Sequence, residues 1–272
     1  DRHCSSGKWS DVQCIRADHR RQDTCVALQT FAQDFGINPG FFARLIWQES
    51  RFDPNALSHA NAMGIAQFIR STADLRGLDD PYNPAMALEH SAQYLAELSE
   101  KFGNLGMAAA AYNGGEGRVE RSFDGGGFAR ETIDYVNIIT GHAIESWKTA
   151  PYPTADYRLD GDTPFLEACL EMAGSGRFTP QRALPPPLKP WAVRLAWGSS
   201  RDRALAAYRS NTTSCREILG PEKLDLVTVP NRLRGKPPFV MAHIGRNSRQ
   251  AAGALCRELN ALGCVCRVFR NP

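Results

Sequence analysis

The sequence predicts an α+β protein of two domains joined by a linker, and three observations support this prediction. Apolar residues have helical spacing, without a convincing strand pattern, before residue 150. Prolines then interrupt residues 151–190, and alternating apolar residues follow over 191–272. The chain of 272 residues also exceeds the usual domain size of roughly 100–150 residues. We therefore expect an all-helical domain over 1–150, a linker over 151–190 and a smaller domain over 191–272.

The helices expected in the first domain begin with an N-terminal layer. Four apolar residues between 25 and 35 share helical spacing: Val26, Leu28, Ala32 and Phe35. Asn38 followed by Pro39 is a strong helix start, because the asparagine side chain caps the first turn and proline suits its first position. That helix should end near Ser50. Further helices are expected at about 62–73, 84–102, 104–112 and 130–147.

Proline residues define the linker. They include Pro153, Pro164, Pro180 and a run of three over residues 185–187. Proline neither continues a helix nor fits a central strand, because it lacks the backbone N–H. One short helix is expected within the linker at Phe165 to Met172, held in place by Cys169.

Strand signals characterise the last domain. Alternating or β-branched apolar residues indicate strands over 191–197, 224–229, 239–244 and 264–269. Helical spacing returns over 201–208 and 248–262. The order of elements is βαβ followed by βαβ, which predicts four strands with helices on one face of the sheet.

The net charge of +3 conceals two oppositely charged parts. Residues 181–272 contain 16 Lys and Arg against 5 Asp and Glu, whereas residues 1–180 contain 16 against 24. A basic domain attracts polyanions such as nucleic acid, anionic lipid or a glycan that carries peptide carboxylates. RNA binding by a sheet needs aromatic residues interleaved with Lys and Arg on a central strand, and the sequence lacks that pattern. We therefore expect no nucleic-acid partner. No membrane span is expected either, because no apolar run approaches the roughly 18 residues required.

Eight cysteines indicate the compartment: Cys4, Cys14, Cys25, Cys169, Cys215, Cys256, Cys264 and Cys266. Their number is even, and they lack the C-x-x-C spacing of zinc sites. Disulfides in an oxidising compartment fit this set, and the alternative is a group of reduced, buried thiols in the cytosol. The chain starts at Asp1 without an initiator Met or an apolar signal core, as in a mature or trimmed protein. We expect no metal site, since His243 has no second ligand at ligand spacing.

Glu49 is the candidate catalytic residue. Phe42, Leu45, Ile46 and Glu49 stand at i, i+3, i+4 and i+7, so the carboxyl group lies on the helix face expected to point inward. Desolvation raises the pKa of a carboxyl group, and a carboxyl that keeps its proton near neutral pH serves as a general acid. The alternative is a glutamate at a frayed helix end that reaches water or pairs with Arg51.

Glu49 opens the first of three ordered sequence blocks: 49–58 (ESRFDPNALS), 62–68 (AMGIAQF) and 110–119 (AAYNGGEGRV). In order and spacing these blocks resemble the signature blocks of soluble lytic transglycosylases, which have a goose-type lysozyme fold. The resemblance covers about residues 38–147 and includes a segment at 131–136 that is similar to the family's closing helix. It implies that the all-α first domain is lysozyme-like.

The resemblance also implies a reaction. The enzymes of this family cleave the β-1,4 bond between N-acetylmuramic acid and N-acetylglucosamine and leave a 1,6-anhydromuramoyl end. Glu49 would act as the single acid and base. Because the C6 hydroxyl of the same sugar attacks the anomeric carbon, no positioned water and no second carboxylate are needed. Asp53 precedes Pro54 and is expected to be a turn residue.

The same resemblance implies a set of substrate-binding residues: Ser58, Met63, Gln67, Tyr112, Asn113 and Tyr135. Ser58 and Gln67 would bind the sugar beside the cleaved bond. Tyr112 would line the cleft near Glu49, and Tyr135 would complete that wall. The alternatives are that Tyr112 is a core aromatic and that residues 113–115 only end a helix. The segment 64–70 departs from the family pattern, which leaves the details of the sugar subsites open.

Residues 191–272 resemble the SPOR domain, a ferredoxin-like (βαβ-βαβ) module that binds septal glycan strands stripped of their peptides. The similarity is strongest over 239–245, in the following helix and over 265–269. It implies a disulfide between Cys256 and Cys266 and leaves the pairing of the other six cysteines open. The alternative is a structural appendage that only widens the cleft.

These observations together predict a periplasmic, monomeric peptidoglycan lytic transglycosylase that acts on glycan strands without a cofactor. One alternative is a hydrolytic muramidase, which would need a second carboxylate such as Glu116 or Glu131 to hold a water molecule. A second alternative is a cell-wall-binding protein whose first domain has lost its activity.

Overall fold

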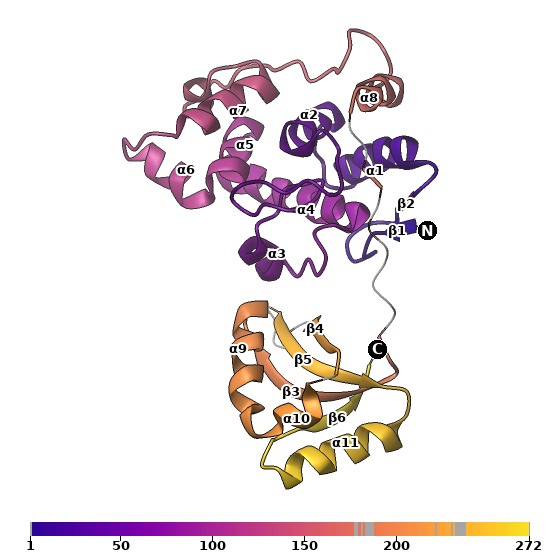
Figure 1. Ribbon diagram of the computed structural model, residues 1–272. Helices are drawn as coiled ribbons and strands as arrows, with labels where there is room; N and C mark the ends of the chain where they lie inside the picture. Colours follow the sequence, from indigo (N-terminus) through magenta and orange to yellow (C-terminus); the bar gives the residue numbers. More distant parts are fainter. Residues whose placement is uncertain are drawn as a thin grey trace. The chain divides into compact units, whose positions relative to one another are not determined.

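The structure is a computed structural model that describes residues 2–176, 179–180, 182, 188–220, 222–229, 231 and 238–271. The chain forms two compact units. The first comprises Asp1–Ile69 and Asp80–Ala183, and the second comprises Arg70–Asp79 and Leu184–Pro272. Figure 1 shows helices in the first unit and a sheet with helices in the second.

The described part of the first unit consists mainly of helices: α1 (Arg20–Asp34), α2 (Pro39–Ser50), α4 (Pro84–Phe102), α5 (Leu105–Gly114), α6 (Glu116–Phe123), α7 (Arg130–Thr140), the short 3-10 helix η1 (Ile144–Trp147) and α8 (Phe165–Gly174). Helices α2 and α4 begin in the same way. Asn38 Oδ1 accepts the backbone N–H of Gly40 at 2.9 Å, and Asn83 Oδ1 accepts that of Ala85 at 3.1 Å. A proline follows each asparagine, as the sequence predicted for α2.

The apolar face of α2 forms part of the core. Phe41, Phe42, Leu45 and Ile46 are fully buried. Helix α5 is rich in alanine, is buried around most of its circumference and contacts α4, α6, α7 and η1. Small side chains allow these helices to approach α5 closely. The core therefore fixes α2, α5 and α7 relative to one another.

The prediction of a helix at about 62–73 is wrong. Residues 56–68 instead form turns with the isolated bridges Leu57↔Met63 and Met63↔Phe68, and a short helix α3 covers only Arg70–Arg76. Asn61, Gly64 and Gln67 have φ values of 60°, 73° and 51°. These left-handed conformations do not fit a right-handed helix. The helix expected at 130–147 also ends early, at Thr140, because Gly141 adopts φ 74°.

A small sheet precedes the helices. Strands β1 (Arg2–Cys4) and β2 (Cys14–Arg16) pair antiparallel and are joined by the Cys4–Cys14 disulfide. The sequence analysis expected only a helical layer here. Strands of three residues are too short to show an alternating pattern, so the first unit is not purely α.

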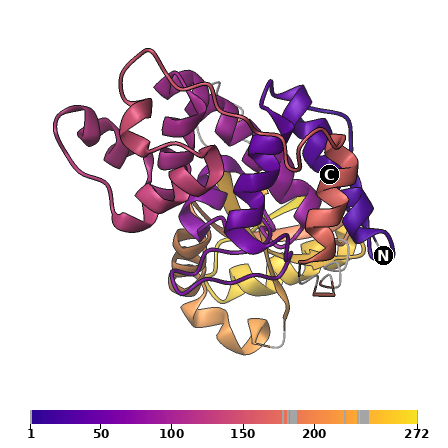
Figure 2. The same ribbon diagram turned by 90° about the horizontal axis from the view of Figure 1, so that it is seen from above.

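Helix α8 agrees with the short helix expected within residues 151–190. The Cys25–Cys169 disulfide joins it to α1, and Figures 1 and 2 both show α8 beside α1. The segment before α8 also contacts the helices, because Arg44 donates to Ile139 O at 3.2 Å and to Arg158 O at 2.7 Å. Residues 151–176 therefore pack within the first unit.

In the second unit the described elements, α3 aside, follow in the order β3 (Trp191–Gly198), α9 (Arg201–Asn211), η2 (Thr213–Cys215), α10 (Arg216–Leu219), β4 (Leu224–Val229), β5 (Phe239–Arg246), α11 (Arg249–Ala261) and β6 (Arg267–Arg270). The four strands form an antiparallel sheet in the order β4-β5-β3-β6. Helices α9 and α11 start with the same cap, because Ser200 accepts the N–H of Arg203 and Ser248 accepts that of Ala251. The strand expected at 264–269 begins only at Arg267.

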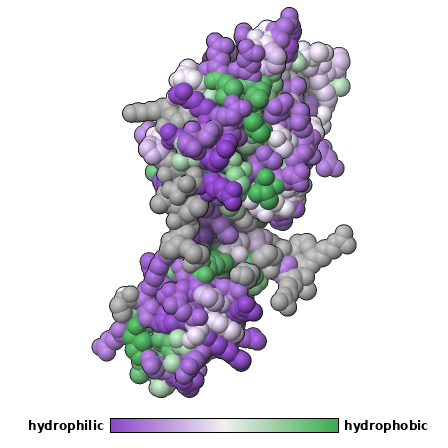
Figure 3. Space-filling view, turned by 90° about the vertical axis from the view of Figure 1, so that its right-hand side faces the viewer, coloured by the Kyte–Doolittle hydropathy of each residue, from purple (hydrophilic) through white to green (hydrophobic). Residues whose placement is uncertain are grey.

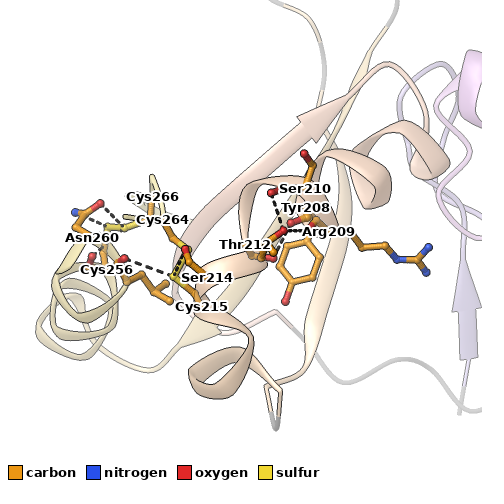
Figure 4. The surroundings of a disulfide bond; sticks show 12 residues. Tyr208, Arg209, Ser210, Thr212, Ser214, Cys215, Cys256, Asn260, Cys264 and Cys266 are labelled. Atoms are coloured by element: carbon orange, nitrogen blue, oxygen red, sulfur yellow. Dashed lines mark hydrogen bonds between the residues drawn. A yellow bond between two sulfur atoms is a disulfide. The ribbon is translucent and has the colours of Figure 1, made fainter. Parts of the chain in front are cut away.

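The core of the second unit lies between the sheet and its helices. It includes Val193, Leu195, Ile244, Leu255 and Leu259. The Cys215–Cys264 and Cys256–Cys266 disulfides lie near each other at its margin (Figure 4). Cys256–Cys266 is the pair that the SPOR resemblance implies. His243, on β5, is fully buried and packs edge-on against Phe269, with ring centroids 5.4 Å apart.

The face of the molecule seen in Figure 3 is largely polar. On the face seen in Figure 3, apolar residues form separate patches among hydrophilic side chains in each unit. Within the described residues, no helix combines the length and the apolar character needed to cross a membrane.

Candidate active site

Glu49 lies in the last turn of α2, on the side that faces α7. The buried apolar face of α2 fixes the direction of this side chain, which is itself half-buried. The hydroxyl group of Tyr135, on α7, donates a hydrogen bond to Glu49 Oε1. Helices α2 and α7 pack against each other, so this contact between residues far apart in the sequence is held by the core.

The electrostatic surroundings of Glu49 suit proton transfer. The pKa of Glu49 is raised from 4.5 to about 7. Burial is the largest cause, the hydrogen bond from Tyr135 lowers the pKa, and the negative charge of Glu131 raises it. Burial also raises the pKa of Tyr135 well above 10, so this phenol keeps its proton and remains a donor. A carboxyl group with a pKa near 7 both gives and accepts a proton at neutral pH.

The chain reverses directly after Glu49. Arg51 and Phe52 adopt φ values of 55° and 62°, which are unfavourable for residues with side chains. Phe52 is fully buried, and its ring packs edge-on against Trp47 at 5.1 Å between centroids. The burial of this ring offsets the strain of the backbone. The reversal at Arg51 and Phe52 directs the chain from α2 into the turn at residues 53–55.

The loop at residues 56–68 is called the sugar loop here, because the sequence analysis expects Ser58 and Gln67 in it to bind a sugar. It is held by a hydrogen bond from the end of α2 and by bonds within the loop. Ser50 Oγ donates to Ile65 O at 2.6 Å, which ties the loop to the end of α2. Gln67 Nε2 donates to Gly64 O at 2.8 Å and to Ala56 O at 3.3 Å. These bonds use the nitrogen of the Gln67 amide and leave its oxygen available to accept a hydrogen bond from a hydroxyl group.

Ser58 and Gly64 shape the same loop. Ser58 Oγ accepts the backbone N–H of Ala62 at 3.0 Å, and its own hydroxyl proton remains available to a ligand. A Cβ atom on Gly64 would lie 1.9 Å from Pro81 O, and the residue has a φ of 73°, so only glycine fits. Met63, within the loop, is buried, with 8% of its surface exposed.

Tyr112 and Asn113 stand at the end of α5. Tyr112 Oη donates to Ala66 O at 2.8 Å and lies 2.9 Å from Ser91 Oγ. Its hydroxyl group therefore links the sugar loop to α4, and Tyr135, rather than Tyr112, makes the hydrogen bond to Glu49. Asn113 Oδ1 accepts from Thr132 Oγ1 at 2.7 Å, which turns the Asn113 amide nitrogen away from α7.

The other carboxylates near these elements have different surroundings. Glu116 accepts from Lys101 at 2.7 Å and from Tyr94 at 3.2 Å. Asp53 Oδ1 accepts the N–H of Asn55 at 3.0 Å, as expected for a turn residue. Glu131, in the first turn of α7, is exposed and acts on Glu49 through its charge.

Three positioning residues escaped the sequence analysis: Ser50, Ser91 and Thr132. Each places a small hydroxyl group where its helix packs against other parts of the unit, and Ser91 and Thr132 are almost fully buried. Buried hydroxyl groups require hydrogen-bond partners, so a small polar residue on an apolar helix stripe was the available signal. Their partners were not predictable, since each lies on another element.

Two further findings concern metal binding and the placement of the predicted site residues. Within the described residues, no group of three or more His, Cys, Asp or Glu side chains is arranged to hold a metal ion. The sequence-predicted residues Glu49, Ser58, Gln67 and Tyr135 come from α2, the sugar loop and α7, and the hydrogen bonds given above hold each of them in place.

Part of this chain is similar to known proteins. Residues 27–132 match the family described as Transglycosylase SLT domain. Peptidoglycan transglycosylase gp16 of Escherichia phage T7 is 39% identical over 99 residues, which cover 34% of this chain and 8% of that protein. Membrane-bound lytic murein transglycosylase C of Actinobacillus pleuropneumoniae serotype 5b is 29% identical over 150 residues, which cover 48% of this chain and 40% of that protein.

A solved structure is also similar, that of an inactive mutant of lytic transglycosylase Slt from Pseudomonas aeruginosa. Its sequence is 27% identical, the match covers 42% of this chain and 22% of that one, and the TM-score is 0.37. The chain spans less than half the length of each of the two curated relatives named above. The matched segment contains Glu49, the sugar loop, Tyr112 and Asn113. Residues 27–132 of this chain form a transglycosylase SLT domain.

Proposed function

We propose that this chain is a peptidoglycan lytic transglycosylase in which Glu49 is the single acid and base. The observation that carries the proposal is the half-buried Glu49 carboxyl group, with a pKa of about 7 and a hydrogen bond from Tyr135, within an SLT domain. The substrate is the β-1,4 bond between N-acetylmuramic acid and N-acetylglucosamine. The product carries a 1,6-anhydromuramoyl end.

The reaction needs two proton transfers at one carboxyl group. Protonated Glu49 first donates its proton to the glycosidic oxygen as the bond to the anomeric carbon breaks. The carboxylate then accepts the proton of the C6 hydroxyl group as that oxygen attacks the anomeric carbon. Tyr135 stabilises the carboxylate between these steps by its hydrogen bond. The carboxyl group returns to its protonated form, so the cycle closes.

The sugar loop and α5 supply the binding groups in this proposal. Gln67 offers its amide oxygen and Ser58 its hydroxyl proton to the sugar beside the cleaved bond. Asn113 presents its amide nitrogen from the end of α5. Met63 is buried within the loop, and Tyr112, from α5, donates a hydrogen bond to the loop at Ala66 O.

A hydrolytic muramidase would need a second carboxylate that holds a water molecule. Glu116 accepts hydrogen bonds from Lys101 and Tyr94, which favours a structural role for this carboxylate. Glu131 is the remaining candidate, because its charge reaches Glu49. The chemical form of the product distinguishes the two reactions.

The test is mass spectrometry of the soluble muropeptides released from purified peptidoglycan by the wild type and by Glu49→Gln. The proposal expects 1,6-anhydro products from the wild type and none from the variant. Products with a reducing end would indicate a muramidase. Absence of products from both proteins would favour a cell-wall-binding role without catalysis.

We also propose that the second unit is a ferredoxin-like, SPOR-like domain that binds glycan strands. The element order and the sheet order β4-β5-β3-β6 support this assignment. Trp197, at the end of β3, is 63% exposed and packs edge-on against Phe239 at 6.2 Å between centroids. An exposed indole ring offers a flat apolar face for a sugar ring.

Trp197→Ala is expected to weaken binding of the full-length chain to peptide-free glycan strands about ten-fold, as loss of an aromatic anchor does. Co-sedimentation with such strands measures this loss, with both the reference protein and Trp197→Ala carrying Glu49→Gln so that the strands are not cleaved. Leu262→Ala is the control, because Leu262 is also a partly exposed apolar residue but follows α11. Equal binding by both variants would support a purely structural second unit.

The proposed place of action is the periplasm. All eight cysteines form disulfides: Cys4–Cys14, Cys25–Cys169, Cys215–Cys264 and Cys256–Cys266. Such bonds persist in oxidising compartments, and the proposed substrate lies there as well.

A further inference from the structure

Three described residues beyond α8 lie against the turn at Asp53 and Asn55. These residues, Thr179, Pro180 and Arg182, are called the post-α8 segment here. The Thr179 hydroxyl group donates to Asp53 Oδ1 and accepts from Asn55 Nδ2, the latter at 2.6 Å. Asn55 Nδ2 also donates to Pro180 O at 2.7 Å, and Arg182 Nε donates to Asn55 Oδ1 at 3.1 Å. The segment therefore engages both ends of the Asn55 amide.

The other side of the post-α8 segment rests on rigid elements of the first unit. Arg20, on α1, donates to Thr179 O at 2.8 Å. The ring of the buried His3, on β1, lies 2.9 Å from Arg182 O, and the Arg182 guanidinium lies 3.3 Å above the ring of Tyr82. Helix α1 is itself joined to α8 by a disulfide. These contacts hold the post-α8 segment in one place against the turn.

The turn at Asp53 and Asn55 leads directly into the sugar loop. Ala56 follows Asn55, and its carbonyl oxygen accepts from the backbone N–H of Gly64 at 2.8 Å and from Gln67 Nε2 at 3.3 Å. A displacement of Asn55 therefore moves an acceptor that orients the Gln67 amide. Ser58, within the sugar loop, lies only three residues beyond Asn55.

We propose that Thr179, together with Arg182, is a positioning residue for sugar binding by the proposed lytic transglycosylase. It lies outside the matched SLT segment, 27–132, and acts through Asn55 and Ala56 on Gln67. This inference rests on the proposed function of that site. Because the segment contacts the turn that leads into the sugar loop and does not contact Glu49, it affects binding of the sugar and not the proton transfer.

The test compares Thr179→Val with Thr179→Ser in the full-length protein. Valine keeps the shape but removes both hydrogen bonds, whereas serine keeps them. Thr163→Val is the matched control, because Thr163 also donates to an aspartate, at 3.1 Å, but this residue is Asp160 and not part of the turn at Asp53 and Asn55. Arg182→Gln is a second variant, which removes an exposed side chain and leaves the Thr179 bonds intact.

Thr179→Val is expected to raise KM for peptidoglycan about ten-fold, the effect of losing one or two net hydrogen bonds. The pH at which kcat/KM declines should not move, and Thr179→Ser should restore KM. Arg182→Gln should raise KM in the same direction. An unchanged KM in Thr179→Val, or an equal rise in Thr163→Val, would overturn the proposal.

A binding measurement separates this proposal from the proposed activity. The affinity of a short β-1,4-linked N-acetylglucosamine oligomer is measured in the Glu49→Gln background with and without Thr179→Val. A ten-fold weaker affinity with Thr179→Val supports positioning even if the wild type releases no soluble product. Equal affinities overturn positioning even if the wild type releases anhydro products.

Discussion

Glu49→Gln is expected to make the protein more stable at alkaline pH, by up to about 3 kcal/mol, while it lowers the proposed turnover about 10³-fold. The loss of turnover follows from removal of the proton that the glycosidic oxygen receives. The gain in stability follows from removal of a carboxyl group whose ionisation is opposed by burial.

The direction of the pH dependence follows from the raised pKa of Glu49. Its pKa of about 7 in the folded protein exceeds the ordinary value of 4.5. Its contribution to the free energy of unfolding is fully present below pH 4.5 and is lost as the pH rises through about 7. Glutamine does not titrate, so the variant and the wild type should be similar in stability at acid pH and diverge above neutral pH.

Urea unfolding of both proteins across this pH range measures the difference. Glu171→Gln is the control, because Glu171 is an exposed carboxylate on α8. It should leave the pH dependence of the wild type unchanged. Parallel curves for Glu49→Gln and the wild type would mean that Glu49 is not desolvated in the folded protein.

Tyr135→Phe provides an independent check on the same carboxyl group. The Tyr135 hydrogen bond lowers the pKa of Glu49, so its removal should raise that pKa and move the loss of stability to higher pH. The descending limb of kcat/KM should move in the same direction.

Removing the Cys25–Cys169 disulfide is expected to destabilise the first unit by about 5 kcal/mol in the double variant Cys25→Ala, Cys169→Ala. The two cysteines are 144 residues apart, and closing a long loop in the unfolded chain removes much of its conformational entropy. Both residues are fully buried, so alanine is the least disruptive replacement.

The Cys4–Cys14 disulfide is the matched comparison within the same unit. Its cysteines are 10 residues apart, so Cys4→Ala, Cys14→Ala should cost about 3 kcal/mol. Urea unfolding without a reductant measures both losses. A larger loss on removing Cys4–Cys14 would contradict the entropic argument.

The sequence predicted those features that depend on neighbouring residues. Asn38 before Pro39 fixed the start of α2, and helical spacing placed Glu49 on its inward face. The alternation after residue 191 predicted the four strands of the second unit. The ordered blocks around Glu49 and Tyr112 indicated the SLT domain, which the family match confirms.

Turns with left-handed residues were harder to predict. Residues 62–68 contain apolar residues at spacings that also suit a helix, yet Gly64 and Gln67 adopt positive φ values. The close approach of Gly64 to Pro81 and the bond from Gln67 to Ala56 stabilise that conformation. Neither partner is visible from local periodicity.

The sequence by itself therefore determined the start of α2, the inward position of Glu49 on that helix and the four strands of the second unit, because capping and periodicity act over a few residues. The tertiary structure alone decided that Tyr135 donates to Glu49, that Cys25 bonds Cys169 and that Thr179 holds Asn55. These contacts join residues distant in the chain, and only the packing of whole helices brings them together. The tertiary structure also decided the raised pKa of Glu49, since burial is a property of the assembled core.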